Sequence, residues 1–143
     1  MSRKSDRRHA FNLIFQAGFR TDVPPGELFE RYFNSGLFTV EEIGLTEKAD
    51  NDYVLKTLLG VNEQTDEIDR EIAGFARGWE LERLLKTDLA ILRLAVYELL
   101  YSKSVPPKVA INEAVELSKV YSGDDSPAFV NGLLGQLARS HGI

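Results

Sequence analysis

The side chains best suited to chemistry are two histidines and a few carboxylates, and their spacing does not assemble a catalytic or metal site. His9 and His141 lie near opposite ends of the 143 residues, and neither has a metal-ligating partner at helical spacing. The absence of cysteine excludes a thiolate zinc site, a cysteine nucleophile and a disulfide framework. The glycines do not follow the spacing of a phosphate-binding loop or a dinucleotide fold. We therefore expect no cofactor, no metal and no enzymatic activity.

Two adjacent acids, Asp124 and Asp125, lie in a polar stretch that runs from Ser122 to Ser126. Asp and Ser in such a stretch accept hydrogen bonds from free backbone amides. A turn that caps the following helix is the simplest interpretation of this pair.

Cationic side chains near the N-terminus give the clearest functional signal. Arg3, Lys4, Arg7 and Arg8 gather where a first helix is expected to begin. A helix N-terminus is itself partly positive, so each cation there costs about 0.3–1 kcal/mol at most. An anionic ligand that uses both the side chains and the free amides offsets this cost, and the phosphates of RNA fit that description. The alternative interpretation is a frayed, solvated terminus with incidental charge.

The distribution of charge supports a local anion site on an acidic protein. The net charge is -5, yet residues 1–20 hold five Lys or Arg against one carboxylate. Residues 22–71 hold thirteen carboxylates against four cations. Because polyanion binding depends on local basic density, the net charge does not exclude RNA.

Apolar residues recur at helical spacing along the sequence, without the alternation typical of strands. The sequence predicts an all-α single domain, residues 1–143, of about seven helices. The expected bounds are Ser5 or Asp6 to Thr21, Pro25 to Phe33, Thr46 onward with a kink or break near Gly60 and Asn62, a continuation to Ala76, Thr87 to Ser102, Val109 to Tyr121, and Pro127 onward. Residues 37–45 are expected to connect helices, and residues 78–81 to form a turn around a buried Trp79. The segment 89–100 is apolar nearly all round, so we expect it to lie at the centre, shared by two small sub-bundles.

Two aromatic side chains are candidates for stacking on RNA bases. Phe15 lies about one residue off the best apolar stripe of the first helix, and Phe129 follows the polar loop. Aromatic planes that are partly exposed stack on unpaired bases. Core packing is the alternative for both.

Five segments resemble the NusB transcription antitermination family over nearly the whole chain. They run from Arg7 to Gln16, Trp79 to Leu84, Asp88 to Leu99, Val105 to Leu117, and Phe129 to Leu134. The resemblance departs at Ala128, where the family commonly has Lys. It implies the NusB fold and a cytoplasmic, non-catalytic factor that binds boxA RNA together with NusE, a small-subunit ribosomal protein. That complex would join RNA polymerase and suppress premature termination, especially in ribosomal RNA transcription.

The resemblance also implies roles for single residues. RNA binding would fall to Arg3, Lys4, Arg7, Arg8, Phe15, Asp125 and Phe129. Contact with the protein partner would fall to Glu82 and Asp88. A competing hypothesis remains open: a helical protein-protein interaction module or homodimer with no direct role in RNA binding.

Several polar residues of these segments have a structural interpretation. Arg93, Glu98, Asn112 and Asn131 stand among apolar neighbours, and we expect them to pair inside the bundle because buried polar groups need partners. Gly132 is expected to permit close helix packing. No stretch approaches the roughly 20 uninterrupted apolar residues of a membrane span.

Overall fold

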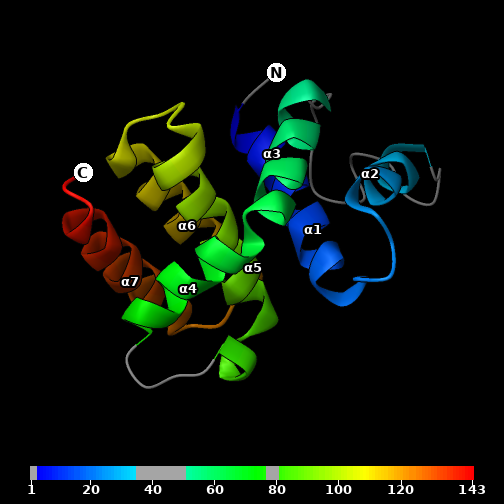
Figure 1. Ribbon diagram of the computed structural model, residues 1–143. Coiled ribbons are helices and arrows are strands. Elements are labelled where there is room, and N and C mark those ends of the chain that lie inside the picture. The colour runs from blue at the N-terminus through cyan, green and yellow to red at the C-terminus, as the bar shows by residue number, and fades with distance from the viewer. Residues whose placement is uncertain (1–2, 35–50, 77–80) are drawn as a thin grey trace. The chain divides into compact units, whose positions relative to one another are not determined.

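The computed structural model describes residues 3–34, 51–76 and 81–143 (Figure 1). All regular structure in these residues is helical, as the sequence predicted. They form two compact units, residues 1–62 and 63–143. The expected connector at 37–45, the helix start at Thr46 and the turn around Trp79 lie outside the described residues. Within the described residues, no helix is long and apolar enough to cross a bilayer.

The first unit contains α1 (Arg3–Phe19), α2 (Pro25–Asn34) and α3 (Asn51–Glu63). Helix α1 packs on α2 and buries Ala10, Leu13 and Ile14. Pro25 opens α2 as predicted, because proline at the first helical position loses no hydrogen bond. The predicted cap at Ser5 or Asp6 is wrong, since α1 begins at Arg3 and both residues lie inside it.

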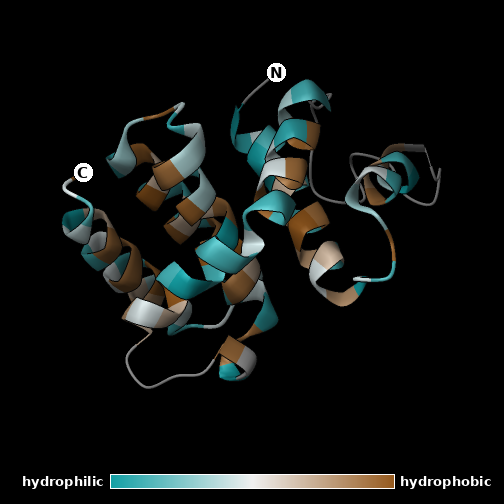
Figure 2. Ribbon diagram, in the orientation of Figure 1, coloured by the Kyte–Doolittle hydropathy of each residue, from teal (hydrophilic) through white to brown (hydrophobic). Residues whose placement is uncertain are grey.

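The second unit contains α4, a 3₁₀ helix η1, α5, a π-helical turn η2, α6 and α7. Their bounds are Thr65–Phe75, Leu81–Arg83, Lys86–Tyr97, Glu98–Ser102, Pro107–Tyr121 and Ser126–Ser140. Helix α5 is the centre of this unit, packed on α4, α6 and α7, and it is buried nearly all round as its composition predicted. Figure 2 shows the hydrophobic residues of α5, α6 and α7 that supply this core.

Prolines and a left-handed residue set the helix ends of the second unit. The α5 helix widens into η2, and Lys103, with a φ of 51°, ends it by donating its amide to the Glu98 carbonyl at 2.9 Å. Helix α6 begins at Pro107, two residues before the predicted Val109, because proline fits the first turn. Pro127 lies in the first turn of α7, as predicted.

The break between α3 and α4 falls at Gln64, later than the predicted Gly60 and Asn62. Both of those residues continue α3, and the chain leaves helical geometry for a single residue. Gln64 still accepts a hydrogen bond through its carbonyl from the Ile68 amide, at 2.9 Å. A break was therefore predicted correctly, but at an earlier position than the one where it occurs.

Side-chain polar contacts join α4 to its neighbours. Arg93 on α5 makes two bonds of 2.9 Å to the carboxylate of Asp69 on α4. His141, after α7, lies 2.7 Å from a carboxylate oxygen of Glu71. The predicted pairing of Arg93 within the bundle is confirmed, and so is the burial of Glu98, which is 3% exposed.

Candidate nucleic-acid interface

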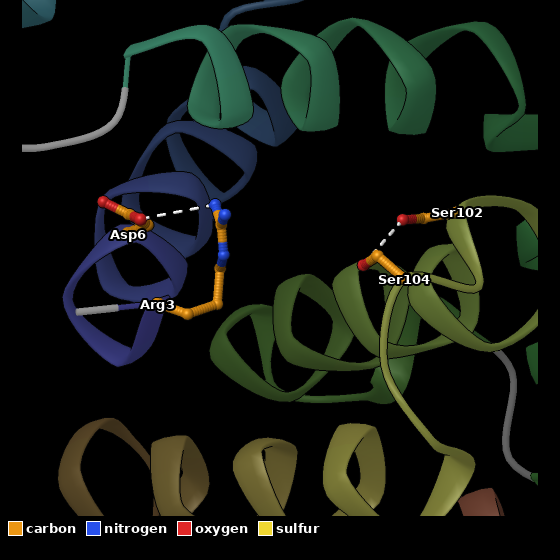
Figure 3. Close-up of polar contacts among 4 residues, drawn as sticks. All are labelled: Arg3, Asp6, Ser102 and Ser104. Carbon is orange, nitrogen blue, oxygen red and sulfur yellow. Dashed lines mark hydrogen bonds and ion pairs between the residues drawn. The ribbon is translucent and has the colours of Figure 1, made fainter. Parts of the chain in front are cut away.

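The four N-terminal cations have different environments. Arg3 pairs with Asp6 at 3.3 Å, as Figure 3 shows, and its guanidinium carbon lies 4.0 Å from the centre of the Tyr53 ring on α3. Asp6 is only 2% exposed, whereas the Arg3 side chain is 45% exposed. The Asp6 carboxylate therefore offsets part of the Arg3 charge, and Arg3 joins α1 to α3.

Arg7 is the clearest departure from the sequence prediction. Arg7 was expected to bind RNA, yet it is only 4% exposed. Its position explains this: Arg7, Ala10 and Ile14 follow one another at helical spacing, so Arg7 continues the buried stripe by one turn. The Arg7 side chain is therefore buried and does not lie on the surface that the other cations could form.

The outward stripe of α1 carries Lys4 and Arg8, followed by Phe15 and Phe19. Lys4 is exposed, Arg8 and Phe15 are half-buried, and Phe19 is 57% exposed. These residues follow at intervals of four, seven and four, which keeps them on one side of a helix. The Phe15 and Phe19 rings meet edge to face, with centroids 5.0 Å apart. One side of α1 thus offers cations near its start and two aromatic rings near its end, of which Phe19 is exposed and Phe15 half-buried.

Phe19 is a candidate that the sequence prediction missed. The signal was available, because Phe19 lies one helical turn beyond Phe15 on the same side. An aromatic pair with one exposed ring, on the same side of a helix as two cations, suits unpaired bases linked by phosphates.

A second candidate surface lies at the start of α7. Asp125 is exposed and occupies the N-cap position, but its side chain makes no capping hydrogen bond. The predicted capping role is therefore wrong for Asp125, and its carboxylate faces solvent. Phe129 is half-buried one turn later, as the sequence suggested.

Two of the polar residues predicted to pair inside the bundle are instead at the surface. Asn112 on α6 and Asn131 on α7 are both exposed. Gly132 is exposed as well, and a Cβ added there would meet nothing within 4 Å, so it is not needed for close helix packing. Neighbouring apolar residues misled the prediction, because successive residues of a helix point in different directions, so that Asn131 is exposed although it follows the buried Val130.

Two residues, Glu82 and Asp88, were predicted to face a protein partner. Glu82 belongs to η1. Asp88 is 5% exposed in the first turn of α5, and its two carboxylate oxygens accept hydrogen bonds from Ser122 and Ser126. The carboxylate of Asp88 is thus buried and accepts hydrogen bonds from both ends of the loop between α6 and α7.

Of the two histidines, His9 is engaged in packing. His9 is 1% exposed, and its Nδ1 lies 2.9 Å from the Tyr32 hydroxyl of α2. Burial lowers the pKa of His9 below its ordinary 6.5, and the charge of Asp6 opposes this shift. In the part of the chain that the structure describes, no group of three His, Asp or Glu side chains is placed to hold a metal ion.

These features define a class of protein: a small all-α protein. Its described polar side chains take part in packing, anchor a loop, or belong to one of two charged or aromatic surfaces. Comparison with known proteins then gives the family. The NusB family model matches residues 4–139. The transcription antitermination protein NusB of Acetivibrio thermocellus is 42% identical over 139 residues, which cover 97% of this chain and 90% of that protein.

Solved structures agree with this assignment. NusB of T. maritima superposes with a TM-score of 0.80 at 34% identity, covering 97% of this chain and 92% of that one. A crystal structure of the antitermination factors NusB and NusE in complex with double-stranded RNA gives 0.79 at 30% identity, covering 96% of both chains. The chain belongs to the NusB family.

Proposed function

We propose that this protein is a non-catalytic transcription antitermination factor that binds RNA of the boxA type together with NusE. One observation carries the proposal: the chain matches over 96% of its length a protein solved in complex with NusE and RNA. By analogy, the complex would act with RNA polymerase on nascent transcripts, which in bacteria places it in the cytoplasm.

The RNA contacts are proposed to come from two surfaces. On α1, Lys4 and Arg8 supply phosphate contacts, and Phe15 and Phe19 supply rings for base stacking. Arg3 contributes charge that Asp6 partly offsets, and Arg7, which is buried, is left out of this surface.

The second surface is the start of α7, with Asp125 and Phe129. Phe129 is proposed to stack on a base and Asp125 to accept hydrogen bonds from base edges, since a carboxylate repels phosphates. Ala128 is exposed where the family commonly has Lys, so we assign most phosphate contact to α1.

The test is a charge-matched binding titration. Lys4→Ala with Arg8→Ala should weaken binding to boxA RNA and lower the magnitude of its salt slope by roughly one to two, because each neutralised phosphate contributes a little under one to that slope. The control pair, Lys56→Ala with Arg70→Ala, removes the same charge from exposed positions on α3 and α4 and should leave the slope near wild type.

Each outcome has a clear meaning. Binding that is unchanged by the Lys4 and Arg8 pair would refute the α1 assignment. Wild-type protein that fails to distinguish boxA RNA from a scrambled sequence, with NusE present, would refute the proposed function and favour a protein-protein module or homodimer.

A further inference from the structure

Three hydroxyl groups and one carboxylate form a cluster where the start of α5 meets the loop between α6 and α7. Ser122 lies 2.6 Å from Oδ1 of Asp88, and Ser126 lies 3.0 Å from Oδ2. The Thr87 hydroxyl lies 3.0 Å from the Ser122 oxygen. Asp88 and Ser126 are buried, whereas Thr87 and Ser122 are half-buried, so the carboxylate lies on the inner side of the cluster.

The hydrogen bonds of this cluster can all be satisfied at once. Ser126 is also 3.0 Å from the Ser122 oxygen, but its single proton can serve only one acceptor. A carboxylate is the stronger acceptor, so Ser122 and Ser126 each donate to Asp88. Thr87 then donates to the Ser122 oxygen, and each of the three hydroxyl protons has one acceptor.

The carboxylate of Asp88 is supported by its place in the fold. It lies in the first turn of α5, where free amides and the helix dipole favour negative charge. No ion pair involves Asp88 among the described residues. The start of α5 therefore supplies an anchor that depends on the two serines for its remaining hydrogen bonds.

The two serines stand at the two ends of the exposed loop. Ser122 ends α6 and Ser126 begins α7, with Gly123, Asp124 and Asp125 between them. In the loop, the Ser126 amide donates to the Gly123 carbonyl at 3.1 Å. The Asp88 carboxylate accepts hydrogen bonds from both ends of the loop. It therefore fixes the direction in which the loop and the first turn of α7 point.

We infer that Asp88 is a positioning residue for the RNA surface at the start of α7, holding Asp125 and Phe129 in place through Ser122 and Ser126. The inference rests on the proposed function, because it assigns Asp88 a part in RNA binding rather than a direct contact with the protein partner. It predicts that the carboxylate and the two serines act as one unit.

The first test compares both sides of the cluster. Asp88→Ala, and separately Ser122→Ala with Ser126→Ala, should each weaken RNA binding by about three- to tenfold, the scale of one or two missing hydrogen bonds. Asp88→Asn should restore most of the affinity, because an amide can accept from one serine and donate to the other. The Asp88→Asn variant also tests the inference if Asp88→Ala does not fold.

A double-mutant cycle separates positioning from general stability. If Asp88 acts through Phe129, Asp88→Ala should cost little RNA affinity in a Phe129→Ala background. Hydrogen exchange of the Ser126 and Phe129 amides should become faster in Asp88→Ala, while the Leu134 amide stays protected. Additive losses, or unchanged exchange with a selective loss of NusE affinity, would overturn the inference and leave the proposed function intact.

The matched control lies where η2 ends and the loop to α6 begins, in the same unit. Ser102 donates to Ser104 at 3.1 Å, a hydroxyl pair drawn in Figure 3. Ser102→Ala should leave RNA affinity unchanged, and an equal loss would show that any loop hydroxyl matters. Wild-type protein that binds no RNA would instead refute the proposed function, even if Asp88→Ala loosens the loop.

Discussion

Replacing Gly132 by alanine should make the protein more stable and its RNA binding weaker. Gly132 is the seventh residue of α7, is exposed, and has open space where a Cβ would lie. Alanine is favoured over glycine inside a helix by about 0.5–1 kcal/mol. For a chain of this size, that gain should raise the melting temperature by about 2–4 °C.

The same methyl group should interfere with RNA. Asp125, Phe129 and Gly132 are spaced by four and three residues, so they share one side of α7. If a nucleotide packs against this side with Phe129, the added methyl group occupies part of its place. We expect RNA affinity to fall about three- to tenfold, roughly 1 kcal/mol, the low end for an overpacked contact.

Gly74 on α4 provides the control. It is exposed, lies in a helix and has equally open space at its Cβ position. Gly74→Ala should give a comparable gain in stability with no change in RNA affinity. Thermal melting and fluorescence anisotropy with labelled boxA RNA measure the two effects. A more stable Gly132→Ala variant with wild-type affinity would refute the assignment of this side of α7 to RNA.

Two predictions concern stability. Arg93→Ala and Asp69→Ala should each destabilise the protein. A double-mutant cycle measured by denaturant unfolding should give a coupling free energy of about 1–3 kcal/mol, because the pair is bidentate and mostly shielded from water. A coupling near zero would contradict this. Folded His9 resists protonation while unfolded His9 takes up a proton near pH 6.5, so stability falls as pH drops below that value. From about pH 7.5 to 5.5, wild type should lose more stability than His9→Gln, by at most about 1.4 kcal/mol. Equal losses would show that His9 is not responsible.

Helical periodicity predicted most of the fold. The central helix was recognised because its residues from Leu89 to Leu100 are apolar on nearly every side, which only a helix surrounded by others can tolerate. Helix starts were placed within about one residue where proline marked them, at Pro25 and Pro127. The start of α6 was predicted at Val109, and the helix begins two residues earlier, at Pro107. The start of α1 was placed too late because Ser and Asp are residue types that often cap helices. In the structure, Ser5 and Asp6 are both buried within the helix.

The site was only partly predictable, because composition counts charges without saying where they point. Four clustered cations suggested one basic surface, but Arg7 is buried and Arg3 lies against Asp6 and Tyr53. The same periodicity that predicted the core could have separated them. Extending the buried stripe of α1 backward includes Arg7, and extending its outward side includes Lys4.

Asp88 shows what periodicity cannot reach. An acidic residue in the first turn of a helix is favoured by the dipole whether its carboxylate faces solvent, a partner or another loop. Only the fold brings Ser122 and Ser126, more than thirty residues later, within hydrogen-bond distance. Because both serines bond to Asp88, a substitution at Asp88 alters the loop between α6 and α7. A loss of partner binding in an Asp88 variant would therefore not by itself locate the partner at α5. Comparing the Asp88 variant with the paired serine variant resolves this, since the serines report on the loop and leave the carboxylate in place.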